Sequence, residues 1–280
     1  MTKAATVSGS FDDLRCAAVR FLQEASRLAP VHVLLWSDQQ VQAHTGRPPK
    51  FPARERRYLL ESLRYVHRVT VPEGTFAPDT LPQAGRPRAG WWAVGEAEDS
   101  GGRRAFAAAH GLEYRVIRGA QLGGFPAHPP DGLAASAPGT GRPARRKVLV
   151  TGCFDWFHSG HVRFFEQASA LGDLYVVVGH DENVRLLKGE GHPLFPAAER
   201  RYLVQAVRHV RQALVSSGSG WLDAEPEIQA LQPQVYVVNE DGDKPEKRAY
   251  CEERAIQYVV LKRQPSPGLP RRQSTDLRGY

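Results

Sequence analysis

The sequence predicts an α/β fold made of two tandem parallel-sheet domains, and two observations lead to this prediction. First, short apolar runs rich in β-branched residues alternate with segments whose apolar residues recur at helical spacing. Such alternation is typical of a parallel sheet covered by helices on both faces. Second, the chain repeats itself. Residues 7–28 align without a gap with residues 150–171, and residues 51–66 align with residues 195–210.

The repeat also predicts the domain boundaries. Residues 1–126 and 145–270 align as two copies of one unit. Between them, residues 127–146 are dense in Pro, Gly, Ala and Ser and lack an apolar period, which is typical of a flexible linker. We therefore expect a first domain over residues 1–126 and a second domain over residues 147–280.

Each element of the second copy follows from its local pattern. Residues 147–150 are an apolar, β-branched run that ends at Thr151, and this predicts a buried strand. From Gly160 onward, apolar residues recur at helical spacing. On the same grounds we expect strands over residues 147–150, 174–178, 213–215, 235–238 and 258–261, and helices over residues 161–171, 197–210, 225–231 and 247–254. A ligand crevice is expected at the carboxyl ends of these strands.

Two histidines lie where the first of these strands gives way to its helix. His158 and His161 flank Gly160 at the start of the helix. A helix N-terminus offers unpaired N–H groups and the positive end of a dipole, so it attracts phosphate. The pattern therefore predicts a phosphate-handling site. It resembles the GxFDxxHxGH signature of the cytidylyltransferase-like nucleotidyltransferases at Gly152, Phe154, Asp155, His158, Gly160 and His161.

The resemblance implies a Rossmann-like, HUP-type nucleotidyltransferase domain with His158 and His161 as catalytic residues. Lys188 matches the lysine of the related KGxxRPxxP loop, and it would bridge the phosphates of the substrate and the nucleotide. The expected nucleotide-binding residues are Gly152, Cys153, Phe154, Asp155, Gly160, Arg200, Asn239, Asp241, Ser274 and Thr275.

Several of these assignments rest on motifs near the end of the chain. RRQSTDL, at residues 271–277, resembles the ISTT motif of these enzymes, in which hydroxyls and helix-start N–H groups bind the β- and γ-phosphates. Relatives also have an arginine just before this motif, and Arg263, Arg271 and Arg272 are all candidates. The turn after residues 235–238 resembles their GDD-like turn, with Asp241 or Asp243 in the acidic role.

The implied reaction leaves the substrates open. The tandem arrangement resembles ethanolamine-phosphate cytidylyltransferases, which favours CMP transfer from CTP to a phosphorylated alcohol, polyol or sugar. LKGEGHPLFP resembles the adenylyltransferase half of bacterial heptose-phosphate enzymes, which favours ATP and a sugar 1-phosphate. A non-catalytic nucleotide sensor is a third alternative. Mg²⁺ is expected with the triphosphate, and no protein-held metal site is expected.

The first copy lacks the residues that carry this chemistry. Arg15 aligns with His158 and Ala18 aligns with His161. We therefore expect a non-catalytic first domain, although a different binding function for it is an alternative. Single-domain relatives are commonly dimers, so the resemblance implies that the two domains pack as a pseudo-dimer. The chain would then be a pseudo-dimeric monomer or a homodimer.

Composition narrows the partners and the compartment. The net charge of +7 and the pI near 9.5 suit anionic ligands such as nucleotides. The arginines form no block of like charge, so nucleic acid is not expected. No run of 18 apolar residues and no apolar signal core occur, so neither a membrane span nor a signal peptide is expected. Cys16, Cys153 and Cys251 are widely spaced, which fits a reduced, cytoplasmic protein.

Overall fold

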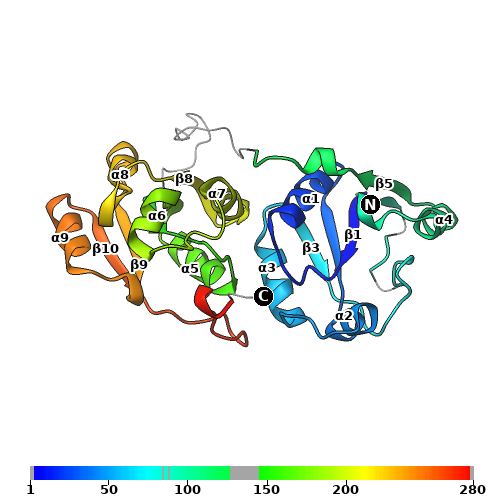
Figure 1. Cartoon of the computed structure of the whole chain (residues 1–280). Helices are drawn as coiled ribbons and strands as arrows, with labels where there is room; N and C mark the ends of the chain where they lie inside the picture. Colours follow the sequence, from blue (N-terminus) through cyan, green and yellow to red (C-terminus); the bar gives the residue numbers. More distant parts are fainter. Residues whose placement is uncertain (1–2, 84, 88, 127–144, 278–280) are drawn as a thin grey trace. The chain divides into compact units, whose positions relative to one another are not determined.

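The computed structural model describes residues 3–83, 85–87, 89–126 and 145–277 (Figure 1). It separates into two compact units, Met1–Gly124 and Phe125–Tyr280. Each unit is one five-stranded parallel sheet whose strands alternate with helices, so the predicted Rossmann-like α/β fold is confirmed. Most of the expected linker lies outside the described residues. In the described part of the chain, no helix is long and apolar enough to cross a membrane.

The first unit has the strand order β3-β2-β1-β4-β5. Its elements are β1 (Ala4–Gly9), α1 (Cys16–Ser26), β2 (Val31–Leu35), α2 (Asp38–Thr45), α3 (Ala53–Ser62), β3 (Val66–Thr70), β4 (Gly90–Gly95), η1 (Glu96–Glu98), α4 (Gly101–Ala109), β5 (Glu113–Ile117) and η2 (Gly119–Leu122). The order reverses at β1, because the chain first builds outward on one side of this strand and then on the other.

The second unit repeats this topology with the order β10-β9-β6-β7-β8. Its elements are β6 (Lys147–Gly152), α5 (Ser159–Ser169), β7 (Asp173–Val178), α6 (Asp181–Lys188), α7 (Ala197–Ala206), β8 (Val210–Val215), η3 (Gly220–Leu222), α8 (Glu225–Leu231), β9 (Val235–Asn239), η4 (Glu240–Gly242), α9 (Pro245–Glu253), β10 (Gln257–Leu261) and η5 (Ser274–Leu277). Its first strand, β6, is therefore central, as β1 is in the first unit.

Three elements differ from the sequence prediction, one of which is β8, which begins at Val210 and not at residue 213. Helix α6 was not predicted. Leu186 and Leu187 are 70% and 57% exposed in it, so its apolar residues do not mark a buried face. The predicted helix over residues 197–210 is too long, because α7 ends at Ala206 and Val207 is already extended. Buried Val207 and Val210 continue the helical apolar spacing by coincidence, since they serve the following turn and strand.

Both faces of the second sheet are buried, as a parallel sheet requires. Val176 and Val178 of β7 contribute to one apolar cluster, and Tyr175 and Val177 contribute to the opposite one. The chain builds outward from β6 in both directions, and a ligand crevice is expected where such a sheet changes direction.

The strand pairing opens that crevice. Strands β6 and β7 pair as far as Gly152 and Val178, at the end of both strands. Strands β6 and β9 pair only as far as Leu149 and Tyr236. The last residues of β6 and β9 are therefore not paired with each other, and a site can form between the carboxyl ends of these two strands.

Candidate active site

His158 is fixed by the way α5 begins. It is the N-cap residue of α5, and its Nδ1 accepts a hydrogen bond from the Gly160 N–H at 3.1 Å. Since Nδ1 is an acceptor, the proton of the neutral ring is on Nε2. A Cβ atom at Gly160 would lie only 2.9 Å from the His158 ring, so the glycine leaves room for this arrangement.

His161 lies one helical turn further, where its ring stacks on that of His158. The ring centroids are 3.9 Å apart and the planes differ by 21°. Phe154 and Phe157 pack against the His161 ring with centroids 5.2 and 5.6 Å away. Within the described residues, His158 Nε2 and His161 Nδ1 are buried and have no hydrogen-bond partner.

Burial keeps both rings neutral. It is the main cause that lowers the pKa of His158 to about 3, and Arg263 and Arg272 add to the effect. The pKa of His161 is lowered well below its ordinary value by burial, then by His158, Arg263 and Lys188. A neutral imidazole carries one N–H, so each ring can donate one hydrogen bond to a bound anion.

A cavity of about 350 Å³ opens beside the His161 ring. Predicted site residues that line it are Gly152, Cys153, Phe154, Asp155, His161, Lys188, Asn239, Asp241 and Ser274. His158 is not among them, but its ring lies against the ring of His161. The structure thus brings most of the predicted site together at the carboxyl ends of β6 and β9. The side chain of Thr275 lies outside the described part of the chain.

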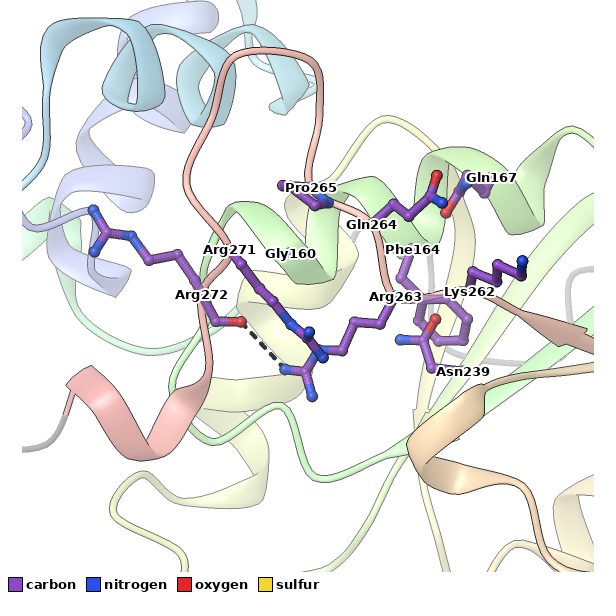
Figure 2. Close-up of a pocket in the computed structure, with 10 residues that line it drawn as sticks. All are labelled: Gly160, Phe164, Gln167, Asn239, Lys262, Arg263, Gln264, Pro265, Arg271 and Arg272. Carbon is purple, nitrogen blue, oxygen red and sulfur yellow. Dashed lines mark hydrogen bonds between the residues drawn. The ribbon is translucent and has the colours of Figure 1, made fainter.

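A smaller, basic pocket lies next to this cavity, at the start of α5 (Figure 2). Gly160, Phe164 and Asn239 line it together with three arginines and Lys262, and its described lining contains no carboxylate. The start of α5 adds N–H groups and a positive dipole end to these cations. The pocket therefore favours an anion.

The structure distinguishes the three candidate arginines. Arg263 lines both pockets, with its guanidinium 2.6 Å from the carboxylate of Asp241. It also donates to the carbonyl oxygen of Arg272 at 3.3 Å. Figure 2 shows that Arg271 extends toward Arg263, whereas the side chain of Arg272 points away from the other labelled residues. Arg263 and Arg271 thus present their guanidinium groups to the site, and Arg272 presents its carbonyl group.

Arg200 does not line the cavity, although it was expected to bind the nucleotide. Its side chain is fully buried in the second unit. The guanidinium donates hydrogen bonds of 2.6–2.8 Å to the carbonyl oxygens of Phe195, Cys153 and Gly179 and to the carboxylate of Asp181. These bonds join the loop after β6 to the ends of β7 and of the loop before α7.

The first unit contains the same buried arginine. Arg56 donates to the carbonyl oxygens of Phe51, Ser10 and Trp36 and to the carboxylate of Asp38. Because the copy without the histidines keeps this network, its function is to hold the loops in place. The geometry assigns Arg200 the same role.

Asp155 and Phe154 also have counterparts in the first unit. Asp155 accepts hydrogen bonds from the backbone N–H groups of Leu194 and Phe195, and Asp12 accepts two equivalent bonds. Phe154 and Phe11 both have positive φ angles, 52° and 45°. Although both residues of the second unit line the cavity, the repeat indicates that they shape the loop around it.

The repeat also separates the two candidate aspartates. Asp243 pairs with Arg248 and accepts a hydrogen bond from Tyr258. Asp99 makes the same two contacts in the first unit, with Arg104 and Tyr114. Asp243 does not line the cavity, whereas Asp241 does. Of the two, Asp241 is therefore the one placed for a role in the site.

Sequence reasoning missed several residues of the cavity. Thr151, Phe164, Lys247 and Gln273 line it, and none of them was singled out as a site residue, although Gln273 lies within the RRQSTDL segment. Only Lys247 carried a usable signal, since it aligns with an arginine, Arg103, in the first copy.

A parallel sheet whose central strand leads into a helix start, beside a cavity at the carboxyl ends of the strands, is typical of nucleotide-binding α/β domains. The sequence model of the cytidylyltransferase-like family matches residues 149–265. The FAD synthase of Ferroglobus placidus is 34% identical over 42% of this chain and 75% of the relative. The chain belongs to the cytidylyltransferase-like family.

Two further relatives match smaller shares of their own length. The FAD synthase of Thermococcus kodakarensis is 40% identical over 34% of this chain and 62% of that protein. The bifunctional protein HldE of Methylococcus capsulatus is 42% identical over 36% of this chain and 21% of that protein. The chain thus spans a little under two thirds of the Thermococcus enzyme and about a fifth of HldE.

Proposed function

We propose that the second unit transfers a nucleotidyl group from a nucleoside triphosphate to the phosphate of a small molecule. An oxygen of the substrate phosphate attacks the α-phosphorus, a new P–O bond forms, and the bond to the β-phosphate breaks to release pyrophosphate. The observation that carries the proposal is the pair of buried, neutral imidazoles, His158 and His161, with unpartnered nitrogens at the start of α5.

The position of each site residue suggests which part of the reaction it serves. His158 and His161 donate hydrogen bonds to the charge that develops on the α-phosphoryl group. Lys188 lies at the end of α6, across the cavity from β9, and is placed to hold the incoming phosphate. No protein nucleophile is required, since positioning and charge stabilisation supply the catalysis.

The basic pocket of Figure 2 would bind the β- and γ-phosphates. Arg263 and Arg271 supply cations there, and α5 supplies its N-terminal dipole. Ser274 and Thr275 remain the predicted hydroxyl donors, and Ser274 lines the adjoining cavity.

Mg²⁺ would enter this site as the partner of the triphosphate. In the described ranges, no group of three or more His, Cys, Asp or Glu side chains is arranged to hold a metal ion. Asp241 is one carboxylate at the cavity, and it is paired with Arg263. These residues fit an ion held mainly by phosphate oxygens and water, which is how Mg²⁺ is commonly bound beside nucleotides.

Two nucleotides are candidates. The tandem repeat favours CTP, with CMP transferred to a phosphorylated alcohol, polyol or sugar. The relatives favour ATP as the second candidate, because two of them are named for the synthesis of FAD, which is an adenine dinucleotide. A sugar 1-phosphate or another phosphate monoester would then accept AMP. The three free cysteines support the reducing, cytoplasmic compartment expected for either reaction.

Pyrophosphate release tests the proposal. The full chain is incubated with Mg²⁺ and either CTP or ATP, against a panel of phosphorylated alcohols, polyols, sugars and flavin phosphate. We expect acceptor-dependent release with one of the two nucleotides, and a His161→Ala variant should lack it. Binding of nucleotide without release on any acceptor would instead support the non-catalytic sensor.

A further inference from the structure

Lys247 is a lysine of the cavity that no motif assigns to the reaction. It lies in the first turn of α9, and its side chain lines the cavity. Its amine lies 5.9 Å from the centre of the Tyr236 ring, and the Tyr236 hydroxyl hydrogen-bonds to Thr151 at 2.7 Å. It donates a hydrogen bond to the Gly242 carbonyl oxygen, which is 3.3 Å long and therefore weak.

The first unit shows what a purely structural cation at this position looks like. Arg103 aligns with Lys247 and lies 6.0 Å from the ring of Trp92, which aligns with Tyr236. However, Arg103 is paired with Glu98 at 3.4 Å and with Asp79 at 3.5 Å. No carboxylate of the described residues lies within 4 Å of the Lys247 amine. The second unit thus keeps the cation, but its nearby acids, Asp223 and Asp241, are bonded to Ser216 and Arg263 and not to Lys247.

A half-buried ammonium group that contacts no carboxylate is stabilised when a bound ligand supplies a hydrogen-bond acceptor. Burial is the main cause that lowers the pKa of Lys247, as expected when the charged form loses water. A ligand oxygen or ring nitrogen in the cavity would restore the missing interaction. The amine is thus poised to bind such a group.

The position of Lys247 indicates which part of a ligand it meets. Lys188 follows β7 and Lys247 follows β9, and these strands flank β6 on opposite sides. In the proposed function, the α-phosphate lies at the histidine pair and the β- and γ-phosphates lie in the basic pocket beside Arg263. The space beside Asn239, Gly242 and Lys247 is left for the nucleoside.

We propose that Lys247 is a nucleotide-binding residue that donates a hydrogen bond to the base or sugar of the nucleoside triphosphate. This inference rests on the proposed function, since it takes the second unit as the triphosphate site. In the ligand-free protein the Gly242 carbonyl oxygen is the acceptor of the Lys247 amine, and on binding the nucleoside replaces it. The residue acts in substrate binding, so it should affect KM much more than kcat.

The test compares Lys247→Met with a matched variant of the first unit, Arg103→Met. Methionine keeps the length and the apolar contact with Tyr236 but removes the donor and the charge. We expect the Kd for CTP or ATP with Mg²⁺, measured by calorimetry, to rise at least tenfold, with kcat changed less than threefold. Arg103→Met should leave the Kd unchanged, and Lys247→Arg should restore part of the affinity.

A second measurement keeps this inference separate from the proposed reaction. Reductive methylation of the full chain, read by peptide mass, reports the accessibility of the Lys247 amine without any turnover. Nucleotide should protect Lys247 in the wild-type chain, even if no acceptor supports pyrophosphate release. If nucleotide binds and Lys247→Met keeps wild-type affinity, or Lys247 is not protected, the inference is wrong although the reaction stands. If neither nucleotide binds, both proposals are wrong.

Discussion

At the scale of single residues, the burial of the histidine pair explains both its charge state and its chemistry. The ring of His161 packs against Phe154 and Phe157 and stacks on the buried ring of His158, and this packing removes the water that would stabilise a positive charge. The same packing leaves two ring nitrogens without protein partners. The pair is therefore a preorganised donor site, which needs no reorganisation when charge develops on a bound phosphate.

His161→Ala should lower kcat by roughly 10²-fold or more, because it removes one of these donors from the transition state. Turnover is measured as pyrophosphate release, and circular dichroism verifies the fold. The matched control is His110→Ala in the first unit, where an exposed histidine stacks on Phe106. His161→Leu fills more of the space without offering a donor and should be equally inactive. Near-normal turnover in both His161 variants would remove the histidine from the catalytic assignment.

Burial of the pair also predicts a pH dependence of stability. Above about pH 6.5, both histidines are neutral in the folded and unfolded chain, and they add no pH dependence. As the pH falls, the unfolded chain binds protons near pH 6.5, whereas folded His158 resists until about pH 3. Stability is therefore lost as the pH drops through this window, at up to about 1.4 kcal/mol per pH unit for each histidine.

Melting temperatures at pH 7 and pH 5 measure this effect. The wild-type chain should lose more stability between the two values than a His158→Gln/His161→Gln variant, which has no group to protonate at these positions. His110→Gln, which alters an exposed histidine, should behave as the wild type does. An equal loss in the wild type and in the double variant would show that the pair does not resist protonation in the folded state.

Individual residues show what sequence could predict and what it could not. His161 was predicted at the cavity because the strand-to-helix junction is visible in the sequence, and Lys188 because it matches the lysine of the KGxxRPxxP loop of relatives. The resemblance also placed Arg200 there, but the sequence does not show whether an arginine faces a ligand or backbone carbonyl groups. Lys247 was missed because it belongs to no motif. Its place at the cavity depends on how α9 packs beside β6, which the sequence does not show.

At the scale of elements, the buried arginines join loops that would otherwise be independent. In the second unit, Arg200 connects the loop that leads to His158 with the N-terminus of α6, through Asp181. Helix α6 ends at Lys188, so the same network positions both sides of the site. The helix itself was not predicted: of its apolar residues only Val184 is buried, whereas Leu186 and Leu187 are exposed.

Arg200→Lys should destabilise the second unit by about 3 kcal/mol or more, because it leaves buried acceptors unpaired. Chemical denaturation measures this loss, and calorimetry under native conditions should show nearly unchanged affinity for nucleotide. Arg56→Lys is the matched control, and it should destabilise the first unit by a similar amount. The opposite result for Arg200→Lys, normal stability with much weaker nucleotide binding, would restore the triphosphate role that the sequence suggested.

At the scale of the whole molecule, the repeat separates scaffold from chemistry. Both units keep the strand order, the buried arginine and the aspartate that holds the loop. Only the second unit has the histidine pair. In the first unit Arg15 takes the place of His158, and its side chain donates a hydrogen bond to Asp13. Sequence alignment was sufficient to predict two copies of one parallel-sheet fold, because both copies repeat the same apolar periods. The alignment carries no comparable signal for how two such units assemble.

The assembly therefore remains a prediction, which the resemblance to dimeric relatives motivates. We expect the two units to satisfy each other as the subunits of such a dimer would, so the full chain should be a monomer in solution. The shared ERRYL helix start presents the same surface twice. A linker of about 20 residues reaches about 25 Å on average, which is enough to allow such a contact.

Truncation gives this expectation a direct test by analytical ultracentrifugation. A fragment over residues 145–280 should self-associate or lose solubility, because the apolar surface that the first unit is expected to cover becomes exposed. A fragment over residues 1–126 is the matched control, and it should self-associate for the same reason. Mixing the two fragments should yield a one-to-one complex and restore activity. If residues 145–280 alone form a soluble, fully active monomer, the first unit has a function other than that of a built-in partner subunit.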